Sequence, residues 1–439
     1  MDKTPNHLLS PMRCPVTLAD VDLFGPGAQE HWYEAYPILH REAPVVHLPG
    51  EGLMPGTDGY ILTKYEDISL VVKDPVRFPP TLTLAVGQLL ASGVPPETAP
   101  RTNAMIASMA TLRPNNELYR AHRQELTDPW VGPGSTRHTA MITRFVDQLI
   151  DGFIDRGEVE FIGEFARPLP QYVMASVLGF PLEDIPQLAE WGTAQVTAFV
   201  HGKGHRNQLT DDELTEQFQK LDGFKEYVQQ TVERKRRQPE DDMISWLCQT
   251  EYTALGRKLT DMEVNGVVYA MVIGGLETTQ YALEEQAQLL CENPEYFAAL
   301  KADRELVRSF TEECMRLRSP TQGLSTRITS QDEVFQGVTV PKGSLLHLRF
   351  GAGNVDPDEW ECPYEMRLDR KAVTRHLAFS AGPRVCPGAG ISRLEQTIAW
   401  QRLLQRIDTL AYAPGNTLEH QPGIMLGTLK LNLRFTRAA

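Results

Sequence analysis

The stretch "HLAFSAGPRVCPGAG", residues 376–390, is the most tightly constrained part of this 439-residue chain. Its glycines Gly382 and Gly388 permit a close approach of the backbone to a ligand. Cys386 stands just before the helical pattern "ISRLEQTIAWQRLLQRI", and the dipole at a helix N-terminus favours a thiolate. A thiolate held in a turn with no nearby second ligand suits the axial position of a haem better than a zinc cluster. A buried structural cysteine in a turn rich in glycine and proline is the alternative.

The residue types in this turn follow the haem-binding signature of a known family. Their spacing resembles that of the cytochrome P450 superfamily, here the soluble bacterial-type haem-thiolate monooxygenases, at Phe379, Gly382, Arg384, Cys386 and Gly388. The resemblance implies that Cys386 binds the haem iron, that Arg384 binds a haem propionate, and that the loop lies against the haem. Two residues depart from the family pattern, because Ser380 stands where glycine is usual and Pro387 where an aliphatic residue is common.

The composition is that of an ordinary globular protein. The chain is 41% hydrophobic and 23% charged, and it contains no run of about 18 apolar residues of the kind a membrane-spanning helix needs. Its net charge of −14 disfavours non-specific binding of nucleic acid. Six scattered cysteines favour a reducing compartment over a disulfide framework. The N-terminal residues lack the apolar segment of a signal peptide, so we expect a soluble cytoplasmic enzyme without a membrane anchor.

Hydrophobic periodicity predicts a mostly α-helical protein with small β-sheets. Short alternating runs near residues 40–75 and 320–350 indicate strands, whereas a period of 3.6 residues dominates residues 117–320 and 388–408. No repeat or low-complexity linker interrupts the chain, so we expect one domain over residues 1–439. The resemblance implies the cytochrome P450 fold, a triangular helical prism that encloses the haem.

The segment "GGLETTQ", residues 274–280, interrupts the most apolar long helical pattern. Two adjacent glycines, Gly274 and Gly275, lower helix stability by about 1–2 kcal/mol and can bend or open the helix. The hydroxyl of Thr278 can bond back to a carbonyl and widen the opening. A glycine pair that serves helix packing is the alternative. The segment resembles the family's oxygen-activation motif, which implies that Thr278 hydrogen-bonds dioxygen or an ordered water and that Glu277 relays protons.

Two further patterns contain charged residues. In "TEECMRLRSP", Glu313 and Arg316 are three residues apart, so a helix places them on one face, where such a pair is usually a surface ion pair. The segment resembles the family's ExxR motif, which implies a structural pair in the haem-side core. In "STRITS", Arg327 lies on a predicted strand. The resemblance implies that its guanidinium binds a haem propionate, whereas the alternative is a solvated strand residue.

The helix that begins at "NNELYRAHRQELTDPW" corresponds in the family to an HxxxR helix that contacts the propionates. Here Tyr119 replaces the histidine and Arg123 keeps the spacing, so Arg123 is the predicted contact. A register in which Arg120 makes the contact stays open. The other alternative is a charged helix face that does not contact haem.

The resemblance as a whole implies a monooxygenase that binds haem b (iron protoporphyrin IX) and inserts one atom of O2 into an organic substrate, by hydroxylation or oxidative dealkylation. Electrons would come from NAD(P)H through a separate ferredoxin or flavodoxin-type donor and its reductase, because the chain carries no flavin- or iron–sulfur-binding segment. Two alternatives stay open. A peroxide-dependent haem-thiolate peroxygenase would have no use for Thr278 and the acid before it, and in a non-catalytic haem-binding sensor the whole motif would be idle.

The substrate pocket is predicted from the positions that surround the haem in the family. They are mostly small or apolar and indicate a compact, hydrophobic, small-to-medium substrate: Val267, Ala270, Met271, Leu324, Ile424 and Met425. The loop-like residues 79–116 are expected to supply a further wall, because long loops in compact proteins are usually functional.

Pro387 yields a prediction of its own. In the family, backbone N–H groups just after the cysteine donate to the haem-ligating sulfur, and proline has no N–H. With one donor fewer, the Cys386 thiolate should be richer in electrons and the reduction potential of the iron lower.

Overall fold

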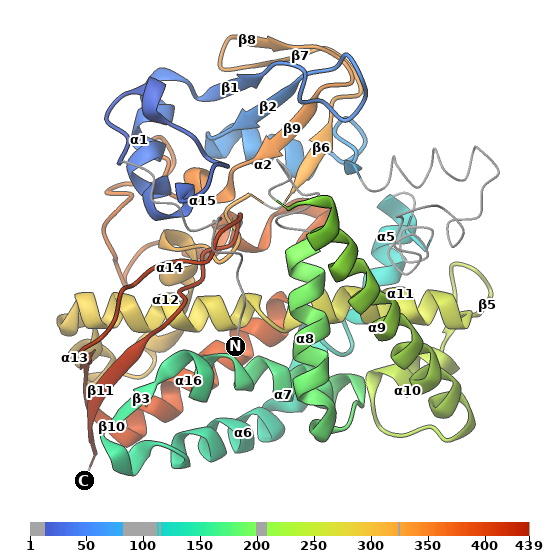
Figure 1. The fold of residues 1–439 in the computed structure, drawn as a ribbon, viewed down its shortest axis with the longest axis vertical. Helices are drawn as coiled ribbons and strands as arrows, with labels where there is room; N and C mark the ends of the chain where they lie inside the picture. Colours follow the sequence, from blue (N-terminus) through green and yellow to red (C-terminus); the bar gives the residue numbers. More distant parts are fainter. Residues whose placement is uncertain (1–13, 82–111, 114–115, 199–208, 324, 439) are drawn as a thin grey trace.

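The computed structural model describes residues 14–81, 112–113, 116–198, 209–323 and 325–438. A large helical part carries a smaller β-rich part at one end (Figure 1). No helix in the described residues combines the length and the apolar character needed to cross a bilayer. The helices are α1 (Trp32–Glu42), α2 (Tyr65–Lys73), α5 (Asn116–His122), α6 (Thr139–Asp151), α7 (Pro168–Leu178), α8 (Ile185–Val196), α9 (Asp211–Arg237), α10 (Met243–Gln249), α11 (Asp261–Gly275), α12 (Thr278–Glu292), α13 (Pro294–Ala302), α14 (Leu306–Leu317), α15 (Phe350–Gly353) and α16 (Ala389–Arg406).

The β-rich part is built around a four-stranded sheet in the order β1-β2-β9-β6. Strand β2 pairs antiparallel with β1 and parallel with β9, and all four of its residues are buried, as expected for a central strand that reads "GYIL". A hairpin of β7 and β8 lies beside this sheet, and a second sheet, in the order β10-β11-β3, joins the C-terminus to the helical part (Figure 1). The strands are β1 (Val45–Leu48), β2 (Gly59–Leu62), β3 (Glu158–Glu160), β4 (Glu251–Tyr252), β5 (Arg257–Lys258), β6 (Thr326–Ile328), β7 (Glu333–Phe335), β8 (Val338–Val340), β9 (Leu345–Leu348), β10 (Ile407–Tyr412) and β11 (Asn432–Arg437).

The predicted fold class is confirmed, and two details differ. Strand pairs near 40–75 and 320–350 are present, but β3, β4 and β5 also occur inside the region predicted as helical. These strands have only two or three residues each, which is too short for a period of two to be visible in a sequence. The helix predicted over residues 388–408 ends at Arg406, where the chain turns into β10.

The long apolar pattern of residues 261–292 forms two helices, α11 and α12, which run nearly in line through the middle of the helical part (Figure 1). The first begins with a capping box in which Thr260 and Glu263 bond each other's backbone N–H groups. It ends at Gly275, whose neighbour from α7 lies so close that a Cβ at this position would be 2.7 Å from Cγ of Met174. The helix therefore ends at the glycine pair, and the close contact at Gly275 fits the helix-packing alternative given for this pair.

Helix α16, which follows the cysteine turn, packs against α6, α12 and α14. Buried polar side chains tie it to α12. The Thr279 hydroxyl donates to Ser392 at 2.9 Å, and the Gln286 amide donates to Gln396 at 2.6 Å. These bonds hold the residues after the helix break in register with the helix that begins just after Cys386.

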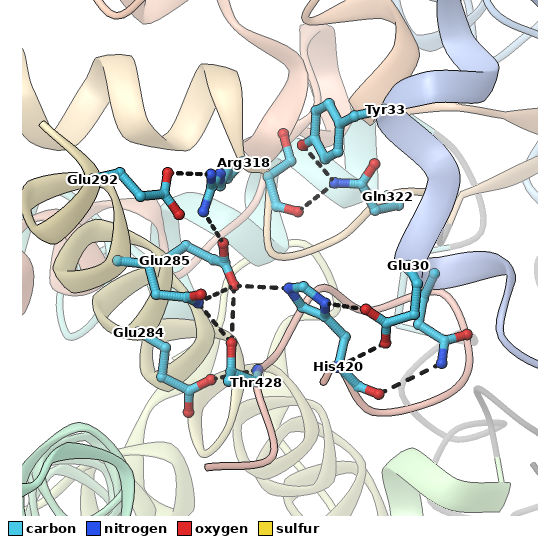
Figure 2. A network of polar contacts seen from close by, with 12 residues as sticks. Glu30, Tyr33, Glu284, Glu285, Glu292, Arg318, Gln322, His420 and Thr428 are labelled. Atoms are coloured by element: carbon cyan, nitrogen blue, oxygen red, sulfur yellow. Dashed lines mark hydrogen bonds and ion pairs between the residues drawn. The ribbon is translucent and has the colours of Figure 1, made fainter. Parts of the chain in front are cut away.

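Between β10 and β11, residues 420–428 form a loop that we call the C-terminal hairpin, closed by a bridge between His420 and Thr428. The base of this hairpin is fixed to α12 (Figure 2). The backbone N–H of Thr428 donates to Glu284 at 2.9 Å, and the His420 ring lies 3.0 Å from Glu30 and 3.5 Å from Glu285. Burial raises the pKa of Glu284 to about 8, whereas Glu285 and Glu30 outweigh burial and raise the pKa of His420 to about 10.

Candidate active site

The Cys386 loop is held from inside by its own backbone. The N–H of Cys386 donates to the carbonyl of Phe379 at 2.8 Å, and the sulfur accepts from the N–H groups of Gly388 and Ala389. Burial raises the pKa of the Cys386 thiol, while these two N–H groups act in the opposite direction. Helix α16 begins at Ala389, so Pro387 lies before the helix and not in its first turn.

Two residues of the loop have a left-handed backbone. Gly382 has φ +71°, and a Cβ there would lie 2.9 Å from the Cα of Lys73, so only glycine fits against α2. Ser380, the departure from the family pattern, has φ +59°, and its buried hydroxyl has no hydrogen-bond partner among the described residues. Glycine would adopt this backbone at lower cost, which explains the residue that is usual in the family.

The break between α11 and α12 has an opening on one side. A Cβ at Gly274 would meet no atom within 4 Å, and the Thr278 hydroxyl donates to the carbonyl of Gly274 at 2.7 Å. The Glu277 carboxylate accepts from the hydroxyls of Tyr281 at 2.6 Å and Thr193 at 3.3 Å. The predicted motif residues Gly274, Gly275, Glu277 and Thr278 thus occupy one turn of irregular helix.

This break and the cysteine loop come together in the fold. Ala282, one turn after Thr278, belongs to the same small apolar cluster as Phe379 and Cys386. The structure therefore brings the predicted thiolate and the predicted oxygen-activation motif to one place, from parts of the chain that are more than a hundred residues apart.

Cationic and aromatic side chains cluster around Arg384 of the cysteine loop. The guanidinium of Arg384 lies over the Tyr119 ring at 4.5 Å, and that of Arg113 lies over the same ring at 5.2 Å. Nε of Arg384 and Nε of Arg327 are buried without a hydrogen-bond partner in the described part of the chain. Burial, with Arg384 nearby, lowers the pKa of Arg327 to about 10. Buried guanidinium N–H groups that lack partners fit a ligand that carries carboxylates, as haem does with its two propionates.

Arg123, the predicted propionate contact, has partners of its own in the structure. Its guanidinium donates to Asp128 at 3.0 Å and to the carbonyl of Val385, next to Cys386, at 2.6 Å, so it supports the cysteine loop. The open alternative, Arg120, is exposed. Their neighbour His122, which the sequence analysis missed, is buried with both ring nitrogens unpartnered among the described residues.

The helix register explains why the side chains of His122 and Arg123 have different surroundings. Helix α5 ends at His122, and a π-helical turn, Arg123–Thr127, follows, so residues after His122 are rotated away from the positions that a regular helix would give them. Burial, reinforced by Arg113, lowers the pKa of His122 well below its usual range. The only sequence signal was a histidine in the expected helix, three residues after Tyr119.

The Glu313–Arg316 pair is buried and complete. Two hydrogen bonds of 2.8 Å join the side chains, and Arg316 also donates to three backbone carbonyls. Arg370, which the sequence analysis did not identify, adds a third member by donating to Glu313 at 2.8 Å. The surface alternative is thereby excluded, and the geometry is that of a structural clamp.

The predicted pocket residues divide into two groups. Val267 and Met271 are buried in the main core, and the partly buried Ala270 packs against it. Ile424 and Met425, at the tip of the C-terminal hairpin, form a separate cluster with Tyr281. Leu324 and most of the loop over residues 79–116 lie outside the described residues.

A hollow of about 380 Å³ opens beside the Cys386 loop. Two arginines line this hollow. Arg308 is exposed, and Nε of Arg393 donates to the Glu312 carboxylate at 2.5 Å. The hollow is formed by Arg308, Thr374, His376, Phe379, Ser380, Val385 and Arg393.

Comparisons with known proteins agree with this geometry. The family model described as cytochrome P450 matches residues 205–435. A biotin biosynthesis cytochrome P450 from Bacillus subtilis (strain 168) is 30% identical over 386 residues, which are 87% of this chain and 90% of that protein. A steroid C26-monooxygenase from Mycolicibacterium smegmatis is 29% identical over 315 residues, 70% of this chain and 76% of that protein.

Solved structures show the same relationship. The crystal structure of P450BioI in complex with a hexadec-9Z-enoic acid ligated acyl carrier protein superimposes with a TM-score of 0.79 and 26% identity, covering 93% of this chain and 99% of that one. CalO2, at 20% identity, has a TM-score of 0.80 over 95% and 99% of the two chains and supports the fold alone. With the family model, the sequence relative and the fold in agreement, this chain belongs to the cytochrome P450 family of haem-thiolate monooxygenases.

Proposed function

We propose that this enzyme inserts one oxygen atom of O2 into a small-to-medium hydrophobic organic molecule, by hydroxylation or oxidative dealkylation. The observation that carries the proposal is the meeting of the Cys386 loop with the helix break at Thr278, through the cluster that contains Ala282 and Cys386. A sulfur ligand and side chains that hold protons then border one site.

The residues present fit a haem. Cys386 would bind the iron, and the unpaired buried groups of Arg327, Arg384 and His122 would hold the propionates. When bound, haem supplies an iron centre that activates dioxygen for transfer of one oxygen atom. Arg123 keeps the sulfur in place indirectly, through the carbonyl of Val385.

Proton handling falls to the helix break. The Thr278 hydroxyl, now bonded to the Gly274 carbonyl, stands beside open space where a small molecule or water could accept its hydrogen bond instead. Glu277 is the nearest acid in the sequence and would resupply the proton.

Electrons would come from NAD(P)H through a ferredoxin or flavodoxin-type protein and its reductase. The hollow beside the Cys386 loop supports this, because its arginines Arg308 and Arg393 would attract an acidic partner in spite of the net charge of −14. The hollow also includes Phe379 and Val385, which adjoin the cysteine, so a partner seated there would be close to the haem.

A hydrophobic substrate is supported by the candidate wall residues Val267, Ala270, Met271, Ile424 and Met425, which are apolar. The similar P450BioI was crystallised with a fatty-acyl carrier protein, and the Mycolicibacterium relative is named as a steroid monooxygenase. An extended or fused-ring hydrocarbon is therefore the class to test first.

The test starts from the haem-loaded protein. Product formation with ferredoxin, reductase and NADPH is compared with formation driven by hydrogen peroxide, using fatty acids and steroids that change the haem absorption on binding. We expect product with the reductase system, reduced about 100-fold or more in Thr278→Ala. Product with peroxide alone would indicate a peroxygenase, and binding without any product would indicate a sensor.

A further inference from the structure

The carboxylate of Glu277 has a support that the family motif does not include. Tyr281, four residues later on α12, donates its hydroxyl proton to Oε2 of Glu277 at 2.6 Å. Residues at this spacing lie on the same face of a helix, one turn apart. Thr193 of α8 donates to the other carboxylate oxygen at 3.3 Å, so Glu277 is held from two elements.

Tyr281 is itself held firmly by the C-terminal hairpin. Its side chain is 3% exposed, and its ring packs against Ile424 and Met425 at the tip of this hairpin. Gly427 makes the room, because a Cβ at that position would lie 2.4 Å from Cδ1 of the tyrosine ring. The hairpin in turn is fixed at its base to Glu284 and other residues of α12 (Figure 2), so the ring has little freedom to rotate away.

The phenol acts as a permanent donor. Burial raises the pKa of Tyr281 well above its usual value, and the adjacent Glu277 raises it further, so the hydroxyl keeps its proton at physiological pH. The amide of Gln421 also bonds this hydroxyl, which fixes its direction. A tyrosine used for packing alone would need neither partner, and phenylalanine would serve equally well.

We propose that Tyr281 is a positioning residue for proton delivery, which sets the orientation of the Glu277 carboxylate beside Thr278. This proposal rests on the proposed function, in which Glu277 supplies the proton. Because the same ring contacts Ile424 and Met425, the position of the acid depends on the hairpin tip that we expect to border the substrate.

The test removes only the hydroxyl, with Tyr281→Phe, and uses Tyr269→Phe as the matched control. Tyr269 is also a buried tyrosine in this pair of helices, but the polar side chain near its hydroxyl is Gln195 and not Glu277. We expect the product formed per NADPH oxidised to fall about tenfold or more in Tyr281→Phe, as for a lost hydrogen bond to a charged group, and to stay unchanged in the control. Peroxide-driven product formation should stay unchanged in both variants.

A second measurement reads the carboxylate without turnover. The infrared difference between wild type and Glu277→Gln identifies the Glu277 band in the resting protein, and Tyr281→Phe should shift it. An unmoved band overturns the proposal, whether or not coupling falls, because the tyrosine would then have only a structural role. If wild type forms no product with either oxidant, the proposed function fails, while the band still reports whether Tyr281 holds Glu277.

A third variant protects the test against misfolding. Glu277→Asp shortens the acid by one methylene and withdraws it from Tyr281 without disturbing the hairpin cluster. We expect the same loss of coupling as in Tyr281→Phe, and no further loss in the double variant. Additive losses in the double variant would contradict the proposal.

Discussion

Arg316 and Arg327 are both buried arginines, and they differ in what surrounds them. Arg316 makes five hydrogen bonds, to Glu313 and to three carbonyls, which matches its five N–H groups. Arg327 donates to one carbonyl and has Arg384 as a charged neighbour. A buried charge is stable only with its partners, so the first arrangement supports the fold and the second is completed by an anionic ligand.

We expect the largest change in stability when the Glu313–Arg316 pair is broken. Glu313→Gln leaves the charge of Arg316 buried beside a neutral amide, and we expect a loss of about 3–5 kcal/mol in the free energy of unfolding. Urea denaturation of the haem-loaded protein measures it, with Arg308→Gln, an exposed arginine, as the control. A loss below about 1 kcal/mol in Glu313→Gln would mean that the pair contributes little more than a surface ion pair does.

The ion pairs of His420 with Glu285 and Glu30 can be broken by raising the pH, because the His420 ring then loses its proton and its charge. The folded pKa of His420, about 10, lies above the usual value of 6.5, because Glu285 and Glu30 favour the charged ring. Its stabilisation is therefore complete below pH 6.5 and is lost as the pH rises toward 10, by about 2–4 kcal/mol. The difference in stability between wild type and His420→Gln should be large at pH 6.5 and small at pH 10.

Glu284 of α12 also favours its protonated form, but because of burial and not because of ion pairs. Burial raises its pKa to about 8, so its neutral form is favoured and the fold loses stability as the pH rises from about 4.5 to 8. Glu284→Gln should therefore be more stable than wild type at pH 8, and the two should be equal near pH 4. A difference that does not vary with pH would contradict the assigned direction.

Replacing Arg327 should have the opposite effect on stability to breaking the Glu313–Arg316 pair. Arg327→Met removes a buried charge that has no carboxylate partner in the described part of the chain, so we expect the haem-free protein to be as stable as wild type or more stable by about 1 kcal/mol. Haem affinity should fall about tenfold, since one propionate loses a charged hydrogen bond. Titration of the haem-free protein with haem measures this, and Arg120→Met, on the exposed face of α5, should bind haem normally.

We expect the smallest effect at the sulfur of Cys386, which lacks a hydrogen bond from residue 387. The sulfur of Cys386 accepts hydrogen bonds from the N–H groups of Gly388 and Ala389, and Pro387 has no N–H that could donate a third. Pro387→Leu restores an N–H, so we expect the reduction potential of the haem to rise. Redox titration of the substrate-free enzyme tests this, and an unchanged or lower potential would reject the role given to Pro387.

Short motifs allowed much of the site to be predicted from the sequence. The Cys386 turn depends on glycine at Gly382 and on the start of the next helix, which are properties of consecutive residues. The Glu313–Arg316 pair and the helix break at Gly274 and Gly275 depend on spacings within one helix. Such features follow from backbone geometry over a few residues, and the structure agrees with them.

Contacts between distant segments could not be predicted. The π-helical turn after His122, and the packing around it, decide that both ring nitrogens of His122 are buried without a partner among the described residues, while Arg123 donates to the carbonyl of Val385. The support of Glu277 by Tyr281 needs the C-terminal hairpin, about 140 residues later in the chain, to fix the ring. From the sequence, the resemblance to the family named the residues that we propose for the chemistry, because its motifs are short and local. Only the tertiary structure decided which buried charges are paired, because burial and partners come from elements that meet when the chain folds.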